Sequence, residues 1–154
     1  MAEIEIIKKE IDFLLEKLGI EAETAVSQNG DFFDVDINPA DNSESGEAGV
    51  LIGYHGETLQ AIQLILSLVV SKKLGNFARL IVNVSDYREK REEKLKEMAL
   101  DAARRAKETK QEVVLGNLTP WQRRIIHVTL AEDADVETQS QGEEPERQLV
   151  IKPK

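Results

Sequence analysis

Two short segments of the chain carry residue types that can bind a ligand. The first is Gly53-Tyr54-His55-Gly56, which directly precedes an apolar helical segment that starts near Glu57. Glycines at both ends of such a loop let the backbone approach a ligand closely, and the following helix offers unpaired N–H groups at the positive end of its dipole. These features favour a phosphate group as the ligand. Two glycines three residues apart are also common by chance, so the spacing alone leaves an ordinary turn open.

The second segment is Arg123-Arg124-Ile125-Ile126-His127. Helical spacing predicts that Arg123, Arg124 and His127 share one exposed edge of a helix. Two guanidinium groups and an imidazole on that edge would form a compact phosphate-binding patch. A helical histidine between core isoleucines is alternatively an interior residue with satisfied hydrogen bonds, and the pattern by itself leaves both interpretations open.

Other kinds of chemistry find little support in the sequence. The chain has no cysteine, which excludes disulfides, thiolate zinc sites and cysteine nucleophiles, and it has only two histidines, His55 and His127. No Walker loop and no serine-centred nucleophile motif is present. Asp31, Asp34 and Asp36 lack the spacing of a calcium loop and fit the solvated face of a strand. We therefore expect a protein without catalytic residues, metal or cofactor.

The charge is distributed unevenly along the chain. The formal net charge of the 154 residues is −9, which at first argues against a nucleic-acid partner. Residues 1–71 carry 3 basic and 14 acidic side chains, residues 72–124 carry 14 and 8, and residues 125–154 carry 3 and 7. A basic segment between two acidic ones indicates a polyanionic partner for part of the protein, and a solvated helix of mixed charge is the alternative.

The first half of the chain alternates between helical and strand patterns. Apolar periodicity predicts a helix over 3–18, strands over 20–27 and 33–37, a helix over 57–73 and a strand over 80–84. Asn29-Gly30 predicts a hairpin between the first two strands, and 39–48 reads as a loop. The helix over 57–73 is apolar on more than one face, so it is either central to a small domain or part of a subunit contact.

The second half repeats this alternation with different spacing. It predicts a helix over 86–107, a strand over 112–115, a helix ending near Leu130, and strands over 136–139 and 148–152 around an acidic turn. Thr119-Pro120-Trp121-Gln122 is a capping box that opens the second helix. A break near Ser85–Asp86 gives two small α+β domains, 1–85 and 86–154, each with helices and a three-stranded sheet. Neither can bury much core alone, which favours packing between them or oligomerisation.

The segment around the glycine loop resembles a KH domain. An apolar residue, Ile52, precedes the loop, a strongly apolar helix follows it, and the order helix–strand–strand–helix–strand resembles the bacterial variety of the fold once a short helix beside the loop is added. In KH domains such a loop clamps the backbone of about four nucleotides. The resemblance implies that Gly53, Tyr54, His55 and Gly56 bind nucleic acid. Tyr54 and His55 replace the Lys or Arg that KH loops often carry there, so the loop lacks their direct charge.

The stretch from Leu118 to His127, together with 136–142 and 147–151, closely resembles the domain named for its Arg-x-x-x-His motif, the R-three-H domain, which binds single-stranded nucleic acid. With the KH-like loop upstream, the pairing looks like the bacterial Jag/KhpB family of RNA-binding proteins. The resemblance covers about residues 49–152 and implies nucleic-acid-binding roles for Arg123, Arg124, His127 and Arg147. Lys90, Lys94 and Arg104 are further candidates on a helix that also bears acids. We expect this chain to lack the additional small N-terminal domain of many members.

We therefore expect a cytoplasmic, non-enzymatic protein that binds single-stranded RNA or DNA, and the resemblance implies a post-transcriptional or cell-envelope regulator. The longest apolar stretch, 64–70, is too short to span a bilayer, and the N-terminal residues do not form a signal peptide. The alternative is a protein-interaction adaptor that dimerises through the KH-like unit. For it, the resemblance implies a homodimer or a second small KH protein as partner, and a peripheral link to a membrane insertase.

Overall fold

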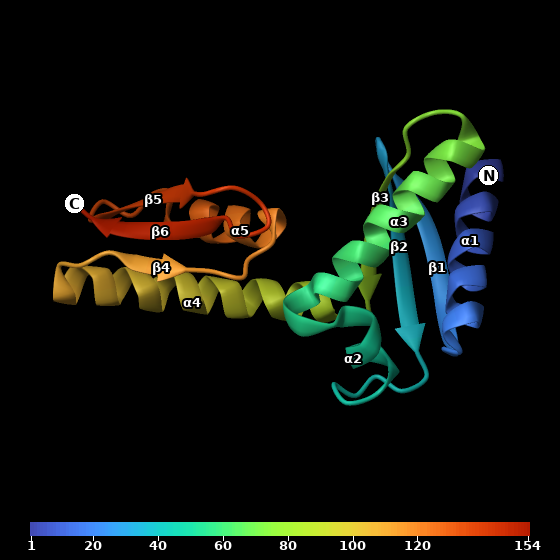
Figure 1. The fold of residues 1–154 in the computed structure, drawn as a ribbon, viewed down its shortest axis with the longest axis horizontal. Coiled ribbons are helices and arrows are strands. Elements are labelled where there is room, and N and C mark those ends of the chain that lie inside the picture. The colour runs from blue at the N-terminus through green and yellow to red at the C-terminus, as the bar shows by residue number, and fades with distance from the viewer. The chain divides into compact units, whose positions relative to one another are not determined.

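The computed structural model describes residues Met1–Lys154 and divides them into two compact units, Met1–Arg88 and Glu89–Lys154 (Figure 1). Each unit combines helices with one three-stranded sheet, so the expectation of an α+β fold with two such sheets is confirmed. No helix is both long enough and apolar enough to cross a membrane.

The first unit is a sheet with helices α1 and α3 as its main cover. Its elements are α1 (Ala2–Leu18), β1 (Ala22–Asn29), β2 (Phe32–Pro39), α2 (Glu47–Ile52), the one-turn 3-10 helix η1 (Tyr54–Gly56), α3 (Glu57–Leu74) and β3 (Arg79–Val84). The strand order is β1-β2-β3, with β1 antiparallel and β3 parallel to β2. Asn29 pairs with Phe32 across a tight turn, which confirms the predicted hairpin.

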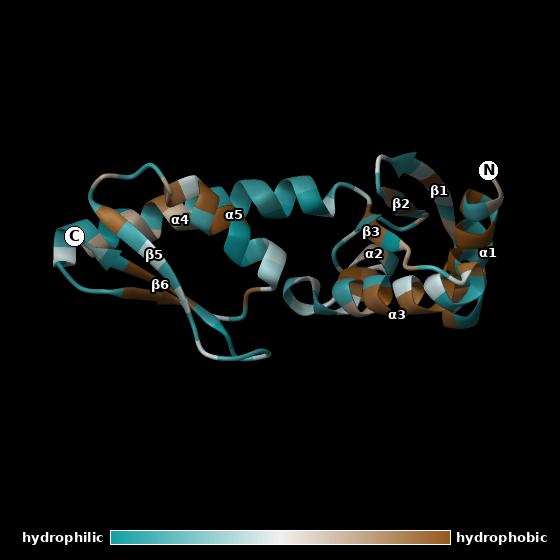
Figure 2. Ribbon diagram, turned by 90° about the horizontal axis from the view of Figure 1, so that it is seen from above, coloured by the Kyte–Doolittle hydropathy of each residue, from teal (hydrophilic) through white to brown (hydrophobic).

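The core of this unit follows from periodicities that are readable in the sequence. Phe33, Val35 and Ile37 alternate along β2 and are all buried, while buried residues of α1 and α3 recur every three or four positions (Ile7, Ile11 and Leu15; Leu59, Ile62, Leu66 and Val70). Figure 2 shows this as hydrophobic segments recurring along both helices. These residues form one continuous hydrophobic cluster.

Helix α2 was not predicted from the apolar pattern, although the KH resemblance required a short helix beside the loop. The loop expected over 39–48 ends earlier, because the chain turns helical at Glu47 and stays helical to Ile52. Six residues make less than two turns, so no apolar period can reveal such a helix. This short helix leads directly into the glycine loop and completes the order on which the KH resemblance depends.

The second unit places two helices beside an antiparallel sheet. Its elements are α4 (Tyr87–Thr109, whose first two residues belong to the first unit), β4 (Val113–Leu115), α5 (Pro120–Leu130), β5 (Val136–Gln141) and β6 (Gln148–Pro153), in the strand order β4-β6-β5. The buried seam of α4 consists of Leu95 and four alanines, and it packs with Ile126, Leu130, Leu149 and Ile151. Small side chains leave room for other elements to approach α4 closely.

Three side-chain hydrogen bonds fix the helix ends of this unit. The predicted capping box of α5 is confirmed: Thr119 Oγ1 accepts from the Gln122 N–H at 3.3 Å, and Gln122 Oε1 accepts from the Thr119 N–H at 3.2 Å. Near the end of α4, Lys107 Nζ donates to Asp133 Oδ2 at 2.8 Å. This hydrogen bond raises the pKa of Lys107 and lowers the pKa of Asp133.

Candidate nucleic-acid interface

The loop between α2 and α3 requires glycine at both of its ends. Gly53 and Gly56 have positive φ values of 71° and 84°, a backbone region that L-residues with a side chain rarely adopt. Space is also lacking: a Cβ on Gly53 would overlap Thr58, and one on Gly56 would lie 2.7 Å from Tyr87 Oη. The two glycines therefore fix the path by which the chain enters α3.

Between the glycines, two aromatic rings are exposed at the surface of the first unit. Tyr54 is 64% exposed, and its ring stacks on the exposed His55 with centroids 4.0 Å apart and an interplanar angle of 11°. No side chain caps the N-terminus of α3, which follows directly. The loop thus offers ring faces for stacking beside helix N–H groups that an anion can accept from.

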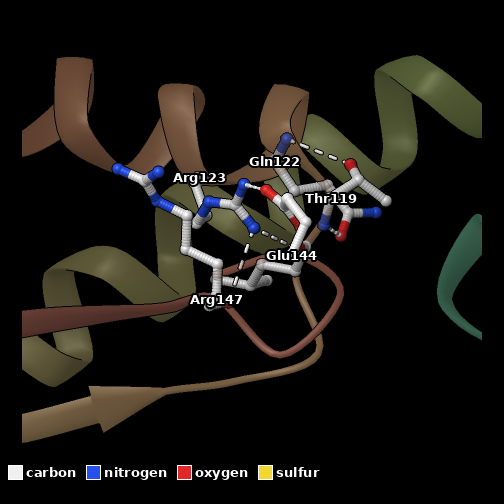
Figure 3. Close-up of polar contacts among 6 residues, drawn as sticks. Thr119, Gln122, Arg123, Glu144 and Arg147 are labelled. Atoms are coloured by element: carbon white, nitrogen blue, oxygen red, sulfur yellow. Dashed lines mark hydrogen bonds and ion pairs between the residues drawn. The ribbon is translucent and has the colours of Figure 1, made fainter. Parts of the chain in front are cut away.

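The expectation that Arg123 lies on an exposed edge of α5 is wrong. The residue is only 6% exposed, because it belongs to the stripe of α5 that is buried with Gln122, Ile126 and Leu130. Its guanidinium lies against the loop between β5 and β6 (Figure 3). Nη1 donates to the carbonyl oxygens of Leu118 at 2.6 Å and Arg147 at 3.4 Å, and Nη2 donates to the carboxylate of Glu144.

Arg124 and His127, by contrast, are exposed, so the alternative of an interior histidine is wrong. His127 Nδ1 is hydrogen-bonded to Thr138 Oγ1 on β5. This contact orients the ring and leaves Nε2 as the nitrogen available to a ligand. Arg124 and His127 lie three residues apart on α5 and can serve one anionic ligand.

The remaining basic candidates differ in their surroundings. The Arg147 side chain is exposed and extends from the β5–β6 loop toward α5 in Figure 3. Lys90 and Lys94 on α4 are also exposed. Arg104 is engaged on the same helix, since Nη2 contacts Asp101 Oδ1 at 2.5 Å and Nη1 lies 3.8 Å from Glu108 Oε1. The hydrogen bond to Asp101 and the two nearby carboxylates raise the pKa of Arg104.

The contacts of two residues in this region, Glu144 and Thr138, were not predicted from the sequence. The sequence placed Glu144 in an acidic turn and Thr138 in a strand of the R-three-H-like stretch, with no role for either, whereas the structure pairs them with Arg123 and His127. The pairs are 21 and 11 residues apart in sequence, so no local pattern could reveal them. No group of three or more His, Cys, Asp or Glu side chains is arranged to hold a metal ion.

Comparison with protein families assigns both units. The family model described as KhpA/KhpB, KH domain, matches residues 8–84, and the model of the R-three-H domain matches residues 93–153. The chain belongs to the KhpB family. Both resemblances recognised in the sequence are thereby confirmed.

Several curated members of the family are similar to this chain. The RNA-binding protein KhpB of Clostridium symbiosum is 41% identical over 110 residues, which is 71% of this chain and 50% of the relative. The protein of the same name from Bacillus subtilis is 35% identical over 107 residues, which is 68% of this chain and 51% of the relative. The protein of the same name from Streptococcus pneumoniae D39 is 28% identical, and the match covers 94% of this chain and 47% of the relative. The chain spans about half the length of these three relatives.

Proposed function

We propose that this chain is a non-enzymatic, cytoplasmic protein that binds single-stranded RNA and acts as a post-transcriptional or cell-envelope regulator. The observation that carries the proposal is the loop from Gly53 to Gly56, whose exposed stacked rings lie beside the uncapped N-terminus of α3. Its geometry suits single strands, because their unpaired bases are free to stack while the backbone follows the amides. The relatives from Clostridium symbiosum and Bacillus subtilis are named RNA-binding proteins, which supports RNA as the nucleic acid.

Each unit has its own part in the proposed binding. In the KH-like domain, taken as residues 1–85, the loop takes the nucleotide backbone and Tyr54 stacks on a base. In the R-three-H-like domain, residues 86–154, the exposed Arg124, His127 and Arg147 contact phosphates. A net charge of −9 opposes non-specific coating, so affinity depends on these local contacts.

Fluorescence polarisation with a labelled single-stranded RNA of mixed sequence tests the proposal. Parallel titrations with single-stranded DNA of the same sequence and with duplex RNA separate the three nucleic-acid classes. We expect saturable binding to single-stranded RNA that weakens with salt, because phosphate contacts release counterions. An absence of binding to any of the three at low salt would contradict RNA binding.

Replacing Tyr54 with alanine is expected to raise the RNA Kd by about ten-fold, since one lost base–aromatic stack is worth about 1–3 kcal/mol. The slope of log Kd against log salt should stay unchanged, because the substitution removes a ring and not a cationic contact with phosphate. Tyr54→Phe keeps the ring and should bind like the unmodified chain. A changed salt slope in Tyr54→Ala would argue against stacking.

A second candidate function is supported by the outer face of α3. Leu64, Ile65 and Leu68 are 60%, 53% and 62% exposed and share one face of the helix, and Phe77 just beyond it is 84% exposed. A cluster of exposed large apolar side chains marks a contact surface. We propose a second KH-type unit as its occupant, from a copy of this chain or a small KH protein, because two equivalent apolar helix faces can cover each other around a two-fold axis.

The double variant Leu64→Glu, Leu68→Glu is expected to abolish this association without unfolding the unit, because both side chains are exposed in the monomer. Light scattering after size exclusion measures the change from dimer to monomer. Leu100→Glu is the control, since Leu100 is a leucine of similar exposure (59%) on α4. A monomeric unmodified chain that also forms no complex with a small KH protein would contradict this role.

A further inference from the structure

The guanidinium of Arg123 forms three hydrogen bonds within the second unit. Its three partners come from two segments: the carbonyl of Leu118 just before α5, and the carbonyl of Arg147 and carboxylate of Glu144 from the β5–β6 loop. The arginine is 6% exposed, while the Glu144 side chain is 51% exposed. A phosphate could reach this guanidinium only by displacing Glu144 and the loop that carries it.

The β5–β6 loop contacts Arg123 in a region where no strand pairing holds it. The β5–β6 ladder ends at the pair Gln141–Gln148, so residues 142–147 extend beyond the last strand pairing. Of the three glutamates in this segment, only Glu144 forms an ion pair with Arg123. The second carbonyl contact of Arg123 is at Arg147 itself, so it holds the backbone from which the Arg147 side chain extends (Figure 3).

We propose that Arg123, the first residue of the Arg-x-x-x-His motif, is a positioning residue rather than a phosphate ligand. It holds the β5–β6 loop through Glu144 and the two carbonyls and thereby places the guanidinium of Arg147 for contact with RNA phosphates. The phosphate contacts themselves come from Arg147 and from the exposed Arg124 and His127. This inference rests on the proposed RNA binding for its ligand, while the ordering of the loop is testable without RNA.

The proposal predicts that the substitution Glu144→Gln weakens RNA binding, although it removes a negative charge. Removing a negative charge beside a phosphate site strengthens RNA binding if only electrostatics matter. If Glu144 instead anchors the loop to Arg123, the same substitution weakens binding, because it removes the charge-assisted contact and releases Arg147. Glu146→Gln is the matched control: it makes the same charge change two residues away, on an exposed side chain for which no hydrogen bond or ion pair is found.

Fluorescence polarisation with single-stranded RNA decides between these outcomes in the full chain. We expect Glu144→Gln to raise the RNA Kd by about five-fold, which is the loss expected for one exposed charge-assisted contact, and Arg147→Ala to have a similar effect. The double variant should bind no more weakly than either single variant, because Glu144 acts through Arg147. Glu146→Gln should bind as tightly as the unmodified chain or more tightly.

Three results would overturn the positioning role. One is tighter binding and a steeper salt dependence in Glu144→Gln, which would make Glu144 a competitor that covers a phosphate site on Arg123. Another is a double variant whose RNA Kd rises by the product of the two single-variant factors, which would show that Glu144 and Arg147 act independently. The third is equal weakening by Glu144→Gln and Glu146→Gln.

Loop order is measured separately by ¹⁵N relaxation without RNA. In Glu144→Gln and Arg123→Met, the order parameters of residues 143, 144, 146 and 147 should fall from about 0.85 to below about 0.6, with the sheet unchanged. Arg123→Lys keeps the charge but loses the forked donors, so it should give intermediate values. Unchanged order in all three variants refutes the anchoring. Loop release in a chain that binds no RNA would confirm the anchoring and contradict only the proposed function.

Discussion

Replacing Gly56 with aspartate is expected to destabilise the first unit by about 3 kcal/mol and to abolish RNA binding by its loop. The backbone at Gly56 has φ of 84°, which costs a residue with a side chain about 1–2 kcal/mol. The added Cβ also lies 2.7 Å from the buried hydroxyl of Tyr87, so either the loop or the start of α4 must shift. The new carboxylate in addition repels phosphates.

Gly75→Asp is a matched control for this substitution. Gly75 has a similar φ of 74°, but a Cβ there would meet nothing within 4 Å. It should therefore cost only the backbone strain and leave RNA binding intact. Equal destabilisation by the two variants would show that contact with Tyr87 does not matter.

Urea unfolding measures these differences, and the chain contains a convenient reporter. Its single tryptophan, Trp121, lies in α5 of the second unit. We expect Gly56→Asp to shift the far-UV circular dichroism transition to lower urea, while the fluorescence of Trp121 follows the second unit. Affinity for RNA should be compared at a temperature where both variants are folded.

The double variant Arg124→Ala, Arg147→Ala is expected to raise the Kd for single-stranded RNA by about thirty-fold at moderate salt, at about 1 kcal/mol for each lost phosphate contact. Both side chains are exposed, so the fold should be preserved. The slope of log affinity against log salt should become shallower by about 1.4, since each contact with a single strand contributes about 0.7. Polarisation titrations at four or more salt concentrations give both quantities.

Arg104→Ala, Arg105→Ala is the control for this charge change. These exposed arginines of α4 are paired with acids of their own helix: both contact Asp101, at 2.5 Å and 3.4 Å, and Arg104 also lies 3.8 Å from Glu108. Their removal should leave the salt slope nearly unchanged. If this variant lowers the slope as much as Arg124→Ala, Arg147→Ala does, the basic helix α4 contributes to binding and the assignment to α5 and the β5–β6 loop is wrong.

Much of the local structure was predictable because its causes are local. The hairpin at Asn29-Gly30 and the capping box at Thr119 depend on residues within four positions of each other, and both are present. Apolar periodicity located the longer helices and the strands to within a few residues. Apolar periodicity did not locate helix α2, because its six residues make less than two turns and no repeat can be recognised. The two motifs were also enough to indicate the family, which the family models confirmed.

The sequence by itself thus determined the order of the longer elements, the two glycines that frame the loop and the family. Only the tertiary structure decided which motif residues face solvent. Arg123 and Arg124 are neighbours in sequence, yet one is buried against Glu144 and the other is exposed. Successive residues of a helix differ by about 100° in direction, so the packing of α5 determines which of two equivalent arginines is turned inward. The partner of the buried one lies 21 residues away, where only the folded chain brings it close.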